Sequence, residues 1–128
     1  MTQVSLFVRV KKDRPIYQKM IKSRVKEYNK LVRDKIPGII KAKGGVPKTR
    51  TLSSDAEYLT ALGKKLHEEV AEYLDDPDIK ELADILEIIH AILEMQNKSF
   101  AELESVRKEK AKERGGFVKR IFLETVEE

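Results

Sequence analysis

The sequence predicts an all-α fold with a helical hairpin at its core and short strand-like segments near the two ends. Between residues 59 and 93, apolar side chains recur every three or four positions, which is the spacing of one helix face. Residues 54–57 and 99–102 each begin with Ser and carry Glu three positions later, the pattern of a capping box. These signals predict about four helices, two of them in the hairpin.

The composition fits one ordered domain without disulfide bonds. The 128 residues include no cysteine, and 38% of them are charged. A chain of this length buries a core without covalent cross-links, and any bound metal ion must have oxygen or imidazole ligands. No apolar run reaches the roughly 20 residues of a membrane span, and residues 4–10 do not resemble a signal peptide. We therefore expect a cytoplasmic protein without membrane contact.

The N-terminal residues differ in charge from the rest of the chain. Residues 1–26 carry eight Lys or Arg and one acid, a net charge of +7, so the remainder sums to −3 within a total of +4. Apolar residues alternate over residues 4–10, as in a short strand. We interpret residues 1–27 as a basic extension and residues 28–128 as the folded domain. Such an arm is usually a solvated tail, and nucleic-acid binding through it is an alternative.

The first folded segment precedes the hairpin. Residues 28–37, with the sequence YNKLVRDKIP, mix apolar and charged side chains and should be irregular or briefly helical. Gly44, Gly45 and Pro47 then interrupt the chain, because these residue types favour turns. This segment should lead into the first long helix.

The two hairpin helices should be joined by a tight turn. Ser54 is the predicted N-cap of the first helix, which should end near Leu74. Residues 75–78 stop it, with Asp76 as the next N-cap and Pro77 at the first position of the second helix. A connection this short makes the helices antiparallel neighbours.

The second hairpin helix should be the central one. It runs from Pro77 to about Asn97 and is apolar over most of its circumference. One short chain offers too few partners to cover this apolar surface, so we expect a homo-oligomer, a dimer or larger. Ser99 opens a third, charged helix that should end at Gly115. A strand-like tail, residues 117–126, follows.

Acidic residues are concentrated around the hairpin turn. From residue 68 to residue 84 there are eight acids and one base. At about 100° per residue from the apolar stripe, Glu69 points most nearly inward, Glu72 is its neighbour at i+3, and Glu68 points away. On the second helix, Glu81 and Asp84 lie on an otherwise apolar surface. Packing the hairpin should therefore bring Glu69, Glu72, Glu81 and Asp84 to one partly desolvated seam.

Four ionised carboxylates at one seam require a counter-charge. Mg²⁺ or Mn²⁺ supplies it, since both ions prefer oxygen ligands and leave positions for water and phosphate. The alternative is that these acids belong to solvated helix faces. Pairs spaced i, i+4 support that alternative, namely Lys64–Glu68, Lys65–Glu69 and Lys80–Asp84.

Two acidic motifs and two flanking segments resemble one family. Residues 68–72 (EEVAE) and 81–84 (ELAD) resemble the paired EExxE and ExxD motifs of the all-α nucleoside triphosphate pyrophosphohydrolases, the MazG-like superfamily. Residues 28–37, and the tail from Arg114 through residues 121–123, are similar to its small phosphoribosyl-ATP pyrophosphohydrolase-like branch. The resemblance covers roughly residues 28–124. Eight residues separate the two motifs, fewer than the family commonly has.

The resemblance implies Mg²⁺- or Mn²⁺-dependent cleavage between the α and β phosphates of a nucleoside triphosphate or related nucleotide, often to remove non-standard nucleotides. By position, it makes Glu69, Glu72, Glu81 and Asp84 the metal ligands and Glu68 a group that orients water, with Glu68 and Glu69 in the catalytic set. Basic residues in the flanking segments suit phosphate, and Asp34 suits a sugar hydroxyl or the orientation of one of the neighbouring basic side chains. The expected substrate-binding residues are Lys30, Arg33, Asp34, Lys35, Arg114 and Lys119. A non-catalytic protein that binds nucleotide and metal is the other possibility.

Overall fold

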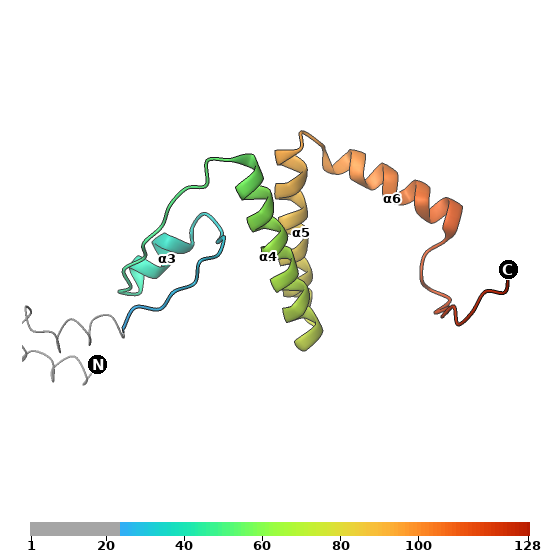
Figure 1. Cartoon of the computed structure of the whole chain (residues 1–128), viewed down its shortest axis with the longest axis horizontal. Helices are drawn as coiled ribbons and strands as arrows, with labels where there is room; N and C mark the ends of the chain where they lie inside the picture. The colour runs from blue at the N-terminus through green and yellow to red at the C-terminus, as the bar shows by residue number, and fades with distance from the viewer. Residues whose placement is uncertain (1–23) are drawn as a thin grey trace, which may run out of the picture. The chain divides into compact units, whose positions relative to one another are not determined.

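The computed structural model describes residues 24–128 (Figure 1). The chain divides into two units, residues 1–30 and residues 31–128. In the second unit the helices are α3 (Ile36–Ala42), α4 (Asp55–Asp75), α5 (Ile79–Met95) and α6 (Phe100–Arg114). Residues 24–128 contain no strand, so the predicted all-α class is confirmed for them. The predicted strand at residues 4–10 lies outside the described residues.

Helix α3 is short and ends in a tight turn. Pro37 lies in its first turn, where the missing backbone N–H has no helical partner to lose. After the helix, Gly44 adopts a φ of 90°, a conformation that favours glycine, and the N–H of Gly45 donates to the carbonyl of Ile40 at 3.0 Å. The preceding residues 31–35 are irregular except for a turn, and they lead directly into this helix.

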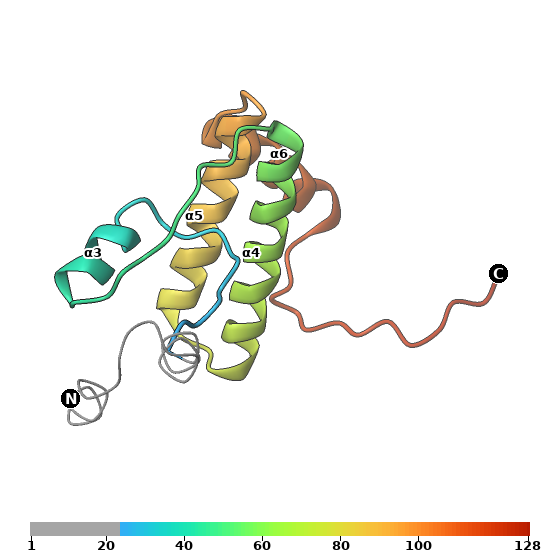
Figure 2. The same cartoon turned by 60° about the vertical axis from the view of Figure 1, so that its left-hand side comes forward.

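Helices α4 and α5 lie side by side and antiparallel, as the two views in Figures 1 and 2 show. The hydroxyl of Ser54 accepts the N–H of Glu57 at 3.0 Å, which confirms the predicted start of α4. The predicted cap at Asp76 is wrong. Asp76 instead closes α4 by donating its N–H to the carbonyl of Glu72, and Asp78 caps α5 by accepting the N–H of Lys80.

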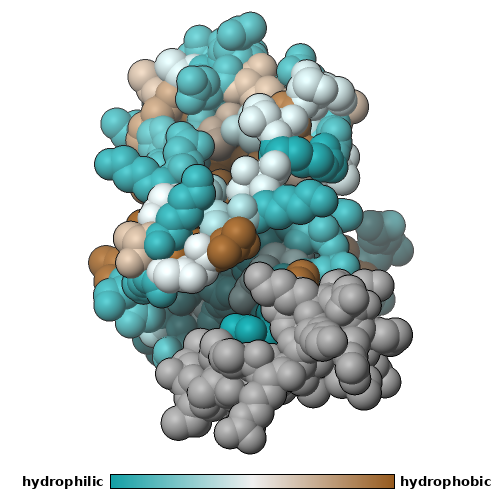
Figure 3. All heavy atoms as spheres, turned by 90° about the vertical axis from the view of Figure 1, so that its left-hand side faces the viewer, coloured by the Kyte–Doolittle hydropathy of each residue, from teal (hydrophilic) through white to brown (hydrophobic). Residues whose placement is uncertain are grey.

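The core of residues 24–128 is small. Its buried apolar side chains are Leu62 of α4, 2% exposed, and Ile88 of α5, 7% exposed. Many other large apolar side chains are exposed, including Leu82 and Leu86 of α5. Figure 3 shows brown apolar side chains scattered among hydrophilic ones on the face that it presents. The oligomer expected from this excess apolar surface stays a prediction.

The third long helix, α6, begins with the predicted capping box. The N–H of Glu102 donates to the hydroxyl of Ser99, and the Glu102 carboxylate accepts the N–H of Ser99. The helix ends at Gly115, whose φ of 82° favours glycine. The predicted strand at residues 117–126 is wrong, because the described residues offer no neighbouring strand to share its backbone hydrogen bonds. No helix in residues 24–128 is both long and apolar enough to cross a membrane.

The small core leads to a stability prediction. We expect Leu62→Ala to lower the free energy of unfolding by at least about 2 kcal/mol, because it removes buried methyl groups and leaves a cavity. Leu74→Ala makes the same substitution on the same helix at a side chain that is 74% exposed, and should cost under about 1 kcal/mol. Urea unfolding followed by circular dichroism measures both, and equal losses would contradict this assignment of the core.

Candidate metal centre

The packing of α4 against α5 brings acidic side chains from both helices together. Oxygens of Glu69, Glu81 and Asp84 lie within 4.8 Å of one another, and so do oxygens of Glu68, Glu69 and Glu72. Glu69 belongs to both groups and is 5% exposed, the one buried charged residue among residues 24–128. The prediction that Glu69 is the most inward acid is confirmed. These five carboxylates, residues 68, 69, 72, 81 and 84, form what we call the seam cluster.

Two oxygens of the seam cluster are buried without a hydrogen-bond partner, Oε2 of Glu69 and Oε2 of Glu81. A buried polar atom without a partner costs about 1–3 kcal/mol, and a buried unpaired charge costs more. Solvated acids on a helix face do not carry this cost, since water satisfies their oxygens. The two oxygens therefore call for either protons or a cation.

Burial and like charge raise the pKa of the inner carboxyl groups. Burial is the main cause at Glu69, with Glu72 adding to it and Lys65 opposing it. At Glu81, burial together with the neighbouring Glu72 and Glu69 raises the pKa to about 7. Without a cation, the seam cluster therefore retains protons that an isolated glutamate loses near pH 4.5.

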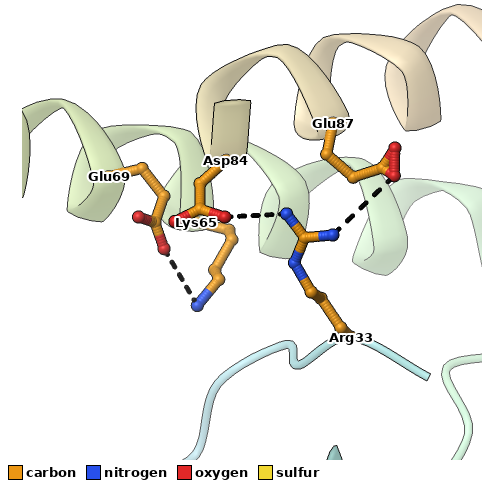
Figure 4. A network of polar contacts seen from close by, with 5 residues as sticks. All are labelled: Arg33, Lys65, Glu69, Asp84 and Glu87. Carbon is orange, nitrogen blue, oxygen red and sulfur yellow. Dashed lines mark hydrogen bonds and ion pairs between the residues drawn. The ribbon is translucent and has the colours of Figure 1, made fainter. Parts of the chain in front are cut away.

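Two basic side chains border the seam cluster, as Figure 4 shows. Lys65 of α4 lies one turn before Glu69, with its Nζ 3.3 Å from Oε1 of Glu69 and 3.8 Å from an oxygen of Glu68. Arg33 comes from the irregular segment before α3 and donates from Nη2 to Oδ1 of Asp84 at 2.7 Å. These two cations neutralise only part of the carboxylate charge.

The seam cluster fits a hard divalent cation. All its donors are carboxylate oxygens, the ligand type that Mg²⁺ and Mn²⁺ prefer. Ligands on opposite sides of a Mg²⁺ ion lie about 4.2 Å apart, so oxygens already within 4.8 Å need only small movements to share one ion. Exposed acidic groups also gather without metal. The two unpartnered buried oxygens distinguish this cluster from such groups.

The structure brings the predicted acidic residues together, and within residues 31–128 Arg33 is the predicted basic residue that pairs with them. Glu68, expected to point away, is half-buried beside Lys65 and within reach of Glu69 and Glu72. The predicted pair of Lys80 with Asp84 is absent, since Asp84 bonds to Arg33 instead. Acids from both helices and one arginine from outside the hairpin thus meet at the seam.

Within residues 31–128, Lys35, Arg114 and Lys119 make no ion pair with the seam cluster. Asp34 and Lys35 are exposed just before α3, Arg114 ends α6, and Lys119 is exposed in the tail. Lys30 belongs to the other unit, where its Nζ lies 5.8 Å from the centre of the Tyr28 ring.

Sequence reasoning missed Glu87 at this site. Its carboxylate lies 3.9 Å from Nη1 of Arg33, and it follows Asp84 by three positions on α5. That spacing puts both side chains on one face of the helix, which was a usable signal. The sequence did not indicate which basic residue would pair with these two acids, because Arg33 lies 51 residues before Asp84.

Comparisons with known proteins found one short likeness. A protein of Mycolicibacterium smegmatis described as uncharacterized is 62% identical to this chain over 42 residues, 33% of this chain and 42% of that protein. The match thus spans less than half the length of this relative. No family model matches the sequence, and no solved structure matches it. The function proposed below therefore rests on the residues of the site.

The raised pKa values lead to a pH prediction. A carboxyl group with a raised pKa in the folded state stabilises the fold at pH values below its ordinary pKa, and this contribution is lost as the pH rises through the folded value. In the presence of EDTA, we expect the free energy of unfolding to fall as the pH rises from about 5.5 toward 7, the folded-state pKa of Glu81, and to level off between about 7 and 8.

Urea unfolding of the original protein, Glu81→Gln and Glu94→Gln across this pH range measures how the free energy of unfolding changes with pH. Glu81→Gln should flatten the decline, because the amide is neutral at every pH, and it should stabilise the protein more at pH 8 than at pH 5.5. Glu94→Gln, an exposed change on the same helix, should keep the original slope. Adding Mg²⁺ should reduce the loss at high pH, because the ion replaces the protons. A profile unchanged by Glu81→Gln would contradict the assignment.

Proposed function

We propose that this protein is a metal-dependent nucleotide pyrophosphohydrolase, which cleaves between the α and β phosphates of a nucleoside triphosphate. One observation carries the proposal. Carboxylates from two helices meet at a partly buried seam where two oxygens have no partner, and their order along the chain follows the EExxE and ExxD motifs. A protein that needed only a stable hairpin would gain more from apolar residues at these positions.

Four residues of the seam cluster would hold the ion, Glu69 and Glu72 from α4 and Glu81 and Asp84 from α5. Glu69 is buried where the two helices pack, which restricts its motion, and the other three carboxylates lie around it with more exposure to solvent. A bound Mg²⁺ or Mn²⁺ ion supplies Lewis acidity, lowering the pKa of a coordinated water and neutralising phosphate oxygens. Glu68, half-buried beside Glu69 and Glu72, would act as the base that accepts a proton from the attacking water.

The reaction transfers a nucleotidyl group to water if the α phosphorus is attacked, or a pyrophosphoryl group if the β phosphorus is attacked. The water oxygen forms a bond to one phosphorus of the α–β anhydride, and the bond from that phosphorus to the bridging oxygen breaks. The products are a nucleoside monophosphate and pyrophosphate, and the proton lost by water passes to a carboxylate such as Glu68. The chain supplies positioning and charge, which are the main requirements of phosphoryl transfer.

Basic side chains near the cluster suit the phosphates of this substrate. Arg33 already lies beside Asp84, and its planar guanidinium matches the geometry of two phosphate oxygens. Lys65 is half-buried beside Glu69, with its Nζ 3.3 Å from Oε1 of that residue, and moderates the negative charge of the site. Cations at this border favour an anionic substrate.

The test is pyrophosphate release from a panel of standard, deoxy and modified nucleoside triphosphates with Mg²⁺ or Mn²⁺. We expect Glu69→Gln and Asp84→Asn each to lower kcat at least about 100-fold, because each removes a charged ligand and weakens stabilisation of the developing phosphate charge. Glu94→Gln removes an exposed acid of α5 outside the cluster and should retain full activity. The same assay run with EDTA should show no turnover.

The outcomes separate the enzyme from its rival. Turnover that survives both Glu69→Gln and Asp84→Asn would show that the seam cluster is not the active site. No turnover across the panel, together with thermal stabilisation by metal and nucleotide, would favour a non-catalytic binding protein of the same construction.

A further inference from the structure

Arg33 links two parts of the second unit that are far apart in the sequence. Its guanidinium reaches α5, with Nη2 2.7 Å from Oδ1 of Asp84 and Nη1 3.9 Å from Oε2 of Glu87 (Figure 4). The residue belongs to the irregular segment between residues 31 and 35, not to the hairpin that builds the seam cluster. The site therefore contains a cation that is separate from the framework holding the acids.

We propose that Arg33 is an exchangeable counter-ion, which occupies Asp84 while no metal is bound and transfers to a phosphate group when metal and substrate enter. Glu87 is a positioning residue that keeps the guanidinium next to the site during this exchange. The competition between Arg33 and a metal ion for Asp84 stands on the geometry alone. The transfer to phosphate rests on the proposed function.

The exposure of the partners makes this ion pair exchangeable. The side chains of Arg33, Asp84 and Glu87 are 53%, 37% and 56% exposed, so water already solvates part of each charge. Ion pairs of this kind contribute little net stability, which makes their rearrangement inexpensive. A divalent cation at Asp84 offers a stronger electrostatic partner than a single guanidinium.

Lys65 provides a comparison within the same site. It pairs with Glu69 at i, i+4 on one helix, and its side chain is 19% exposed, so the atoms packed around it restrict its change of rotamer. Arg33 is joined to the site through non-helical backbone, and a change of its rotamers is enough to leave Asp84. Lys65 is thus the fixed cation, and Arg33 is the one that can exchange.

Glu87 lies outside the group of oxygens that fit a metal ion, since only Glu69, Glu81 and Asp84 come together on that side. Its distance of 3.9 Å from Nη1 is too long for a hydrogen bond but short enough for charge attraction. When Nη2 leaves Asp84, Glu87 still attracts the guanidinium and limits how far it moves. In this arrangement Glu87 attracts Nη1 of Arg33, and Nη2 is left to donate to a phosphate oxygen.

The first measurement is Mn²⁺ binding to the full chain, without nucleotide, by electron paramagnetic resonance of the free ion. Arg33→Gln should bind Mn²⁺ about threefold to tenfold more tightly, because it removes a competing unit charge beside Asp84. Arg50→Gln is the matched control, since Arg50 pairs with Glu57 at the start of α4, and its Mn²⁺ affinity should equal that of the original protein. If Arg33 merely supports the fold, its loss would weaken Mn²⁺ binding, and that result would overturn the proposal.

The second measurement is calorimetric binding of inorganic pyrophosphate at saturating Mg²⁺. Arg33→Gln should weaken this binding at least about tenfold, opposite in sign to its effect on Mn²⁺, and Arg33→Lys should recover part of the loss. Glu87→Gln should weaken pyrophosphate binding about threefold while leaving Mn²⁺ affinity within about a factor of two. Unchanged pyrophosphate binding in Arg33→Gln would overturn the exchange.

These results are independent of the turnover assay. If no nucleoside triphosphate is hydrolysed but Arg33→Gln still shifts Mn²⁺ and pyrophosphate binding in opposite directions, the proposed enzyme fails and the exchange survives. If hydrolysis occurs and both affinities fall in Arg33→Gln, the enzyme stands and the exchange fails.

Discussion

The buried carboxylate of Glu69 is the constraint on which the rest of this site depends. A charged side chain that is 5% exposed must be neutralised by a proton, a basic residue or a metal ion. Lys65 reaches one of its oxygens, and the other has no partner. The acids packed around it increase the need for positive charge, because each raises the cost of ionising the next. The α4–α5 hairpin is therefore a framework for the seam cluster as much as a core.

The small core gives the seam cluster a second role. Leu62 and Ile88 are the buried apolar residues of the described chain, so apolar burial contributes modestly to its stability. A cation bound to both helices would join them and stabilise the folded form in proportion to its affinity. The proposed ion would thus couple folding to metal binding. If the predicted homo-oligomer forms, burial of the exposed apolar side chains of α5 against a second copy would add to this stability.

The positive charges around the site differ in mobility, and this difference connects structure with the proposed chemistry. Lys65 lies on the same helix as Glu69 and is fixed by helical geometry, whereas Arg33 reaches Asp84 from an irregular segment. An enzyme that hydrolyses phosphate anhydrides has to neutralise the negative charge of its own carboxylates before the substrate binds. After the substrate binds, it has to neutralise the negative charge of the phosphates. One fixed and one exchangeable cation meet both requirements without moving the helices.

The sequence by itself determined the helices and which face of α4 is buried, because helix periodicity and capping depend on residues within a few positions of one another. It therefore predicted the caps at Ser54 and Ser99 and the inward position of Glu69. It placed the α5 cap at Asp76 rather than Asp78, since three of the four turn residues are aspartates with similar capping ability. Only the tertiary structure decided that Arg33 pairs with Asp84 and Glu87, and that the C-terminal tail forms no strand in the described chain. Those outcomes depend on which distant segments lie beside one another in the fold, and local residue patterns do not determine such contacts.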